Sequence, residues 1–349
     1  MRNFTFKGLL LTAVFMLLGC LSIQAANDDL ITKQITINLD KAGTLPNKIA
    51  SSEMYKITNL KIIGEINGTD WNMIREMAGR DNRGYGTEGK LSVLDLSEAK
   101  IVKGGDSYYP GDNCYTSNDE IGEKAFTDCS RLTSLTLPVG ITSIGYDAFY
   151  QCSGLTSLTL PAGITSIGDD TFYGCSGLTS LTLPAGITSI GEYAFSGCSG
   201  LTSLNLPAGI TSIDKYAFSG CSRLTSLTLP AGITSIGEFA FSYCSGLTSI
   251  YVYAEKVPRI GRYAFEGCAS RKCTLYVPKG TYDNYRLSEF GYFENIVEFD
   301  ATGIDKTTTS TDVEEVSRYS LNGQRLAVPV KGLNIVKYSD GTVRKVVVK

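Results

Sequence analysis

The reactive side chains that recur most regularly in this chain are cysteines, so their spacing is the first test for chemistry. Metal binding and disulfide exchange both need thiols that converge on one point. One cysteine per repeat instead spreads the thiols along a line, as expected for small apolar residues of a core. The pattern leaves open a disulfide between Cys268 and Cys273 and a free thiol at Cys114. The cysteines spaced by 23 residues, with a last gap of 24, are Cys129, Cys152, Cys175, Cys198, Cys221, Cys244 and Cys268.

Other catalytic constellations find little support. The 349 residues include no histidine, which removes Ser-His-Asp and Cys-His nucleophiles, histidine bases and most zinc enzymes. The adjacent carboxylates Asp169 and Asp170 do not converge on one scissile bond, and no second acid is fixed opposite them. The segment 84–86 (GYG) lacks the strand-to-helix context of a phosphate loop. We therefore expect a protein that is not an enzyme, without cofactor or metal, although carboxylate, Tyr, Lys and Ser-Lys chemistry survive this test.

The N-terminus has the pattern of an export signal. Arg2 and Lys7 precede an apolar stretch at 8–18, and small residues follow at 25–26. The apolar stretch is too short for a stable membrane span, so 1–26 is predicted to be a signal peptide. Cleavage by an ordinary signal peptidase is favoured over the alternative, in which the residues before Cys20 form a lipobox and Cys20 carries a lipid anchor. We expect an exported protein at the outer-membrane surface or outside the cell, with no transmembrane span.

A strict 23-residue repeat determines the expected fold. One unit, from Cys175, reads CSGLTSLTLPAGITSIGEYAFSG. Alternation in 178–183 predicts a short strand with two leucines on one face and Ser180 and Thr182 on the other. A Pro-Ala-Gly turn follows, then a second apolar edge at 187–190. The segment 192–195 is expected to form one helical or 3₁₀ turn that places Phe195 in the core.

Such a unit cannot bury its apolar face alone, so neighbouring units must stack. We predict a leucine-rich-repeat solenoid, a β-rich curved rod with short helical or 3₁₀ turns and a parallel ladder of strands about 4.8 Å apart. The irregular ends are expected to add strands at 58–67 and 91–96, a helix at 71–77, a loop at 104–119, a last strand at 273–278 and a cap at 282–299.

The repeats over roughly 56–299 resemble the BspA-type leucine-rich-repeat surface proteins of Gram-negative gut and oral bacteria. The resemblance implies adhesion, matrix binding or contact between bacteria, and brings no catalytic residues. The tail, with strand-like runs at 319–323, 331–336 and 345–349, resembles a short type IX sorting or anchoring segment. A small β module that ends the molecule is the alternative.

These features divide the chain into six parts. The predicted order is signal peptide at 1–26, N-terminal cap with irregular repeats and an inserted loop at 27–120, regular repeats at 121–273, C-terminal cap at 274–300, linker at 301–317, and the sorting-like β segment at 318–349.

Two surfaces compete for a partner. Positions that vary between otherwise copied units can encode recognition, and tyrosine is favoured at interfaces. These candidates are Tyr146, Tyr173, Tyr193, Tyr216, Phe239, Tyr243 and Tyr263. The polar strand face supplies the alternative candidates Ser180, Thr182, Asn205 and Thr228, which could match a repetitive ligand.

The expected function is a surface or secreted adhesion and protein-binding module for an extracellular protein or matrix component. A glycan-binding surface protein is the alternative. A net charge of −3 without basic clusters argues against nucleic acid as a partner.

Overall fold

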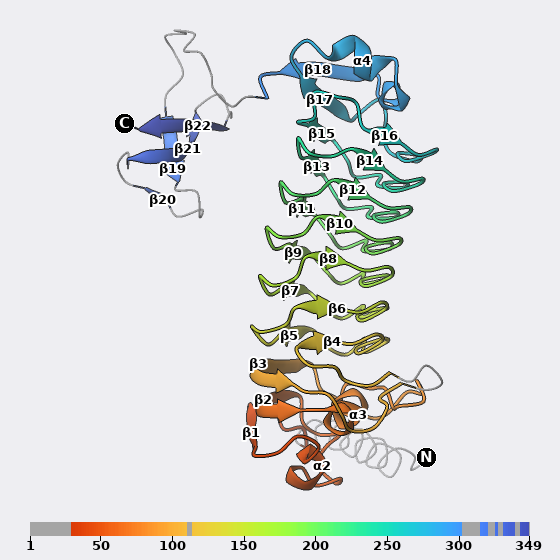
Figure 1. The fold of residues 1–349 in the computed structure, drawn as a ribbon, viewed down its shortest axis with the longest axis vertical. Coiled ribbons are helices and arrows are strands. Elements are labelled where there is room, and N and C mark those ends of the chain that lie inside the picture. The colour runs from red at the N-terminus through yellow and green to blue at the C-terminus, as the bar shows by residue number, and fades with distance from the viewer. Residues whose placement is uncertain are drawn as a thin grey trace, which may run out of the picture.

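The computed structural model describes residues 29–109, 114–301, 315–319, 325–326, 331–338 and 343–348. The predicted signal peptide, Cys20 and most of the predicted linker therefore lie outside the described residues. Within the described part, no helix combines the length and apolar character that a membrane span requires. The chain forms a solenoid whose coils stack into a rod between two capping regions (Figure 1).

The first side of each regular coil is a short parallel strand. Neighbouring strands pair one repeat apart, as in Ser157 with Ser180 and Ser226 with Ser249. Between β9 and β11 the strand pairing is interrupted, although Thr202 still donates its amide to the carbonyl of Thr179. These strands are β5 (Ser134–Thr136), β7 (Ser157–Thr159), β9 (Ser180–Thr182), β11 (Ser203–Asn205), β13 (Ser226–Leu229), β15 (Ser249–Val252) and β17 (Thr274–Pro278).

The second side is a ladder of two-residue strands. Each consists of a polar residue that points outward and an isoleucine that points inward, and Ser189 pairs with both Ser166 and Ser212. In both ladders, strands pair in parallel with the strand one repeat away, which confirms the predicted parallel solenoid. These strands are β4 (Glu120–Ile121), β6 (Ser143–Ile144), β8 (Ser166–Ile167), β10 (Ser189–Ile190), β12 (Ser212–Ile213), β14 (Ser235–Ile236) and β16 (Arg259–Ile260).

The third side is a pair of tight turns. Ser196 and Cys198 each donate an amide to the carbonyl three residues earlier, as in the expected 3₁₀ turn. The turns do not join into a helix, because Tyr193 has φ 54°. The backbone amide of Phe195 instead donates to the carbonyl oxygen of Ala217 in the next coil, at 2.7 Å. This side is therefore also bonded from coil to coil.

A column of phenylalanines fills the core beside these turns. Phe172, Phe195 and Phe218 are fully buried, and their stacked ring centroids lie 5.2 and 5.1 Å apart. The cysteine three residues later donates its thiol to a phenylalanine carbonyl of the preceding coil, as Cys198 Sγ does to Phe172 at 3.2 Å. Burial raises the pKa of these thiols, to about 12 for Cys175. Cys268 and Cys273 are buried and do not form a disulfide.

The N-terminal cap comprises β1 (Ile35–Leu39), α2 (Leu45–Lys48), β2 (Asn59–Ile66), α3 (Gly68–Met77) and β3 (Val93–Ile101). Helix α3 lies over the open end of the core, where the Trp71 ring packs 5.2 Å from Phe126. Trp71 Nε1 and Arg75 Nη1 both donate to the carbonyl of Ala125. The helix predicted at 71–77 and the strands predicted at 58–67 and 91–96 are thus confirmed.

At the other end, α4 (Tyr282–Arg286), the 3₁₀ helix η1 (Glu289–Tyr292) and β18 (Asn295–Phe299) follow β17 (Figure 1). The expectation that 273–278 is the last strand is wrong, because β18 adds one more parallel strand to β17. Phe290 and Phe293 cover the ring of Phe265 at 5.5 and 5.2 Å. The core therefore ends against aromatic side chains.

The described tail strands form a separate antiparallel sheet in the order β20-β19-β21-β22. Their bounds are β19 (Glu315–Tyr319), β20 (Arg325–Leu326), β21 (Gly332–Tyr338) and β22 (Val343–Val348). Inside this sheet, buried Arg318 donates to the Asn334 side chain at 3.3 Å. A small C-terminal β module is therefore present, and its role in sorting or anchoring stays a prediction, as do the six domain boundaries.

Candidate partner-binding surfaces

Most of the aromatic candidates form one continuous row along the turn side of the rod. Centroid distances between consecutive rings are 4.9, 6.3, 4.6, 4.9 and 5.1 Å, and all neighbours are stacked except Tyr173 and Tyr193, which meet edge to face. We call this row the aromatic stripe. Its members are Tyr150, Tyr173, Tyr193, Tyr216, Phe239 and Tyr263.

The backbone under the stripe is in an unusual conformation. Tyr193, Tyr216, Phe239 and Tyr263 have φ between 54 and 58°, and the same position holds Lys124, Asp147 and Asp170 in earlier coils. This left-handed region suits Gly, Asn and Asp, and costs other residues roughly 1–2 kcal/mol. Stacking of aromatic pairs contributes about 0.5–1.5 kcal/mol beyond the burial of ring area. Aspartate therefore fits this position, which we call the corner, at a lower conformational cost than tyrosine or phenylalanine.

The stripe remains accessible because it lies outside the core. Tyr263 is 58% exposed, and Tyr173, Tyr193, Tyr216 and Phe239 are partly buried against one another. Since most of the rings stack face to face, one side of each ring covers its neighbour. The stacked rings are thereby ordered before any partner arrives, which lowers the entropy cost of binding.

Charge is uneven along the stripe. Asp169, Asp170 and Glu192 gather near its earlier coils, and burial together with the charges of Asp147, Asp169 and Glu192 raises the pKa of Asp170 to about 6. Asp169 also accepts the Glu192 amide at 2.8 Å, so this carboxylate holds a turn between coils. The later coils contribute mixed charges. The earlier half of the stripe is consequently the more acidic.

Two predicted aromatic residues stand apart from the stripe. Tyr146 and Tyr243 are 58% and 60% exposed, and neither ring stacks with a stripe ring among the described residues. Each covers a glycine of the next coil. A β-carbon at Gly168 would lie 3.2 Å from the Tyr146 ring, and one at Gly267 would lie 2.7 Å from the Tyr243 ring. Tyr150, by contrast, belongs to the stripe, which its 23-residue spacing from Tyr173 could have revealed.

The second predicted surface is the outward face of the first strand ladder. Ser180 and Thr182 pair in register with Ser157 and Thr159, and Asn205 pairs with Thr228. Ser180, Thr182 and Asn205 are exposed, whereas Thr228 is partly buried. The structure therefore brings these candidates onto one face, which is separate from the stripe.

Two further features mark this strand face. A neighbouring column of threonines uses its hydroxyls for bonds between coils. The hydroxyls of Thr179 and Thr202 each donate to the carbonyl of the threonine one coil earlier, at 3.1 and 3.3 Å. The row that contains Thr228 continues into Tyr251 and Tyr276, whose rings stack at 4.4 Å. Only part of the hydroxyl surface is thus available to a ligand.

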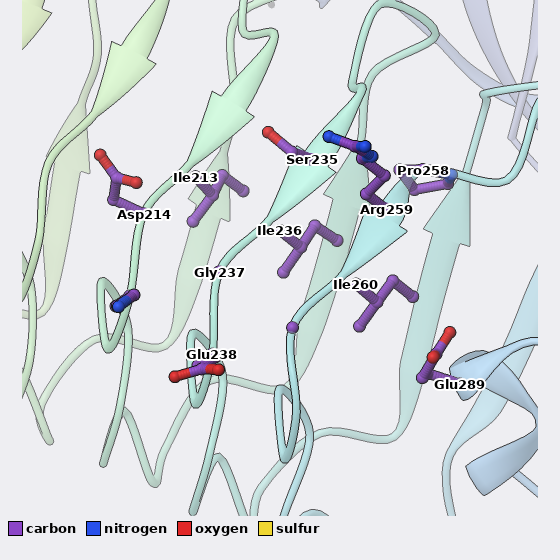
Figure 2. Close-up of a pocket in the computed structure, with 12 residues that line it drawn as sticks. Ile213, Asp214, Ser235, Ile236, Gly237, Glu238, Pro258, Arg259, Ile260 and Glu289 are labelled. Atoms are coloured by element: carbon purple, nitrogen blue, oxygen red, sulfur yellow. The ribbon is translucent and has the colours of Figure 1, made fainter.

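A groove of about 610 Å³ lies at the last coils of the second ladder. Figure 2 shows Ile213, Ile236 and Ile260 in a row on neighbouring strands, with Arg259 at one side and Glu289 approaching from the cap. The repeat pattern did not point to this groove. Its walls carry both signs of charge, and in the described ranges no cluster of three or more potential metal ligands occurs here or elsewhere.

Comparison with known proteins gives one family. The model of the BspA type leucine rich repeat region matches in six copies, over residues 113–224, 165–279 and 212–323. A search of curated protein sequences gave no match.

Solved structures of bacterial leucine-rich repeat proteins are also similar. A protein of T. pallidum is 27% identical, with 42% of this chain and 69% of that chain covered and a TM-score of 0.34. A protein of Bacteroides ovatus is 24% identical, with 53% and 66% covered and a TM-score of 0.24. The pneumococcal vaccine antigen PcpA is 14% identical, with 70% and 80% covered and a TM-score of 0.37.

Proposed function

Because the chain belongs to the family of BspA type leucine rich repeat proteins, we propose that it is an exported surface protein that binds a protein partner. The binding surface is the aromatic stripe, and the partner is an extracellular protein or a matrix component. The protein works as a scaffold and not as an enzyme.

The observation that carries this proposal is the choice of residue at the left-handed corner. The earlier coils hold Lys124 and two aspartates at the corner, whereas the four later coils carry Tyr or Phe at φ between 54 and 58°. Strained backbone conformations of this kind often occur at functional sites. Tyrosine and phenylalanine also supply much of the binding energy at protein interfaces. Ordered aromatic rings along a rod fit a long contact with another protein.

Capture of partners by the mature chain tests the proposal. The chain is immobilised and challenged with a panel of extracellular matrix proteins and bacterial surface proteins. Tyr193→Asn, Tyr216→Asn and Phe239→Asn remove rings but keep a residue that tolerates the left-handed corner. We expect at least a tenfold loss of affinity in each variant. Tyr146→Asn and Tyr243→Asn remove more exposed rings that lie outside the stripe, and both variants should bind as the parent does.

The capture experiment has a clear negative outcome. If the three stripe variants bind every captured protein with unchanged affinity while they remain folded, the stripe is not the binding surface. Circular dichroism and urea unfolding establish the folded state of each variant.

A glycan ligand on the strand face is the second candidate. The observation in its favour is that a row of polar side chains ends at the stacked rings of Tyr251 and Tyr276. A glycan array probed with the parent chain, Thr182→Val and Tyr251→Ala distinguishes the two surfaces. Glycan signals that fall with these variants and not with Tyr216→Asn would favour this alternative.

Export and anchoring are also proposed from the two ends of the chain. Cleavage near 25–26 would release an ordinary secreted protein, whereas a lipid on Cys20 would anchor it. The tail would act as a sorting or anchoring segment. Mass spectrometry of both termini of the native protein, with Cys20→Ser as the matched variant, tests these assignments.

A further inference from the structure

The second ladder of the solenoid ends at β16 without a covering strand. β16 pairs with β14, and no other strand of the described residues pairs with it. The other two sides of the same coil are covered. β17 and β18 extend the first ladder beyond β15, and Phe290 and Phe293 cover Phe265 on the turn side. The C-terminal cap thus closes two sides and leaves the third open.

The burial of the inward isoleucines also differs at this end of the second ladder. Ile190, Ile213 and Ile236, which hold the inward position in earlier coils, are between 0 and 2% exposed. Ile260 holds this position in the last coil and is only partly buried. It borders the groove of about 610 Å³ whose far wall includes Glu289 of the cap (Figure 2). The groove runs along the last three coils, from Ile213 to Ile260, and reaches Glu289 beyond β16.

Backbone groups at this edge are oriented for one more strand. Arg259 donates its amide to Thr234 at 2.9 Å, and Gly261 donates to Ile236 at 2.8 Å. The pairing of Ile236 with Ile260 places Pro258 and Ile260 where Thr234 and Ile236 lie one coil earlier. The carbonyl group of Ile260 consequently faces the open side, whereas Pro258 is buried. Within the described chain no backbone amide donates to either oxygen.

We propose that this edge binds an extended segment of a partner protein, which adds one parallel strand beside β16. A main-chain hydrogen bond to the carbonyl of Ile260 would hold the segment, as in other cases of strand addition at a sheet edge. This site is separate from the aromatic stripe and does not depend on it.

The ladder register also defines the side chains of the segment. Residues paired across parallel strands project to the same face, so the residue beside Arg259 points outward next to the guanidinium. Arg259 is exposed, and no ion pair reaches it from the described residues. An acidic residue is favoured there by charge. The next residue covers Ile260 and must be apolar, as the isoleucine is in every earlier coil.

A peptide titration on the full mature chain tests this site. The probe is a fluorescein-labelled, end-capped peptide of sequence Gly-Thr-Thr-Glu-Ile-Thr-Thr-Gly. Its matched control replaces the glutamate with lysine. A third peptide carries an N-methyl group on the threonine after isoleucine, which removes the amide that would donate to Ile260. We expect the two control peptides to bind at least tenfold more weakly than the probe.

Variants of the chain complete the test. Arg259→Glu should reverse the preference so that the lysine peptide binds better, whereas Arg262→Glu, an exposed arginine on the nearby turn, should leave it unchanged. Tyr216→Asn should also leave peptide binding unchanged. The proposal is overturned if no peptide binds at millimolar concentration, if the glutamate and lysine peptides bind equally, or if Arg259→Glu keeps the original preference.

Discussion

The interior and the corner of each turn lie two residues apart and obey different requirements. In the interior, Phe195 and its equivalents are identical, almost fully buried and stacked at 5.1–5.5 Å. At the corner, Tyr193 and its equivalents change between Lys, Asp, Tyr and Phe while φ stays between 52 and 58°. Both positions build a row of rings, yet only the first row excludes water. The contrast indicates that the inner row stabilises the rod and that the outer row is free to recognise a partner.

Removal of an interior ring should give the largest loss of stability. Phe195→Ala leaves a cavity in the middle of the stacked column and is expected to cost about 3–5 kcal/mol of unfolding free energy. Urea unfolding measures this loss, with Tyr193→Asn as the matched change two residues away. A loss below about 1 kcal/mol in Phe195→Ala would remove the distinction between the two rows.

The buried repeat cysteines provide the next test of the interior. Cys198→Ala removes the bond from Sγ to the Phe172 carbonyl at 3.2 Å and some buried volume, at an expected cost of about 1–2 kcal/mol. Burial raises the pKa of the Cys198 thiol well above its usual value. Iodoacetamide at pH 8 should therefore alkylate the repeat cysteines only after unfolding, since the thiolate is the nucleophile. Rapid alkylation of the native chain would contradict a sealed core.

Asp170 occupies the corner in one of the earlier coils, and its titration gives a test at this position. Its pKa is about 6 in the folded chain, above the ordinary 3.8, because burial and neighbouring carboxylates disfavour the charged form. The folded state therefore binds more protons, and stability should fall as pH rises from about 4 to 6. Screening by solvent keeps the effect below about 1 kcal/mol. Asp170→Asn should flatten this slope in urea unfolding at pH 4 and 7, and an unchanged slope would contradict the assignment.

The smallest expected change in stability is at the aromatic corner. Tyr216→Asn relieves the left-handed strain and loses ring stacking, two contributions of similar size, so unfolding free energy should change by less than about 0.5 kcal/mol. Binding to a captured partner should nevertheless fall at least tenfold. A loss of stability near that of Phe195→Ala would show that the stripe is a structural element.

Much of the fold could be predicted because each coil touches only its neighbours. A residue repeated every 23 positions meets its own copy, so Phe195 and Cys198 could be assigned to the core directly from their spacing. The corner could not be predicted in the same way. One helical or 3₁₀ turn at 192–195 was expected, but the left-handed conformation of Tyr193 was not, because it depends on bonds such as that from the Phe195 amide to Ala217 in the next coil. Of the predicted aromatic sites, Tyr146 and Tyr243 consequently fell outside the stripe.

The sequence alone determined the repeat, the parallel stack and the inward residues, since a fixed period and apolar alternation allow one way to bury the leucines. Tertiary structure decided how the ends close. β18 and the aromatic residues of η1 cover two sides of the last coil, and β16 keeps an open edge beside Ile260. The ends lack identical neighbours, so their contacts follow from packing in three dimensions and not from the period.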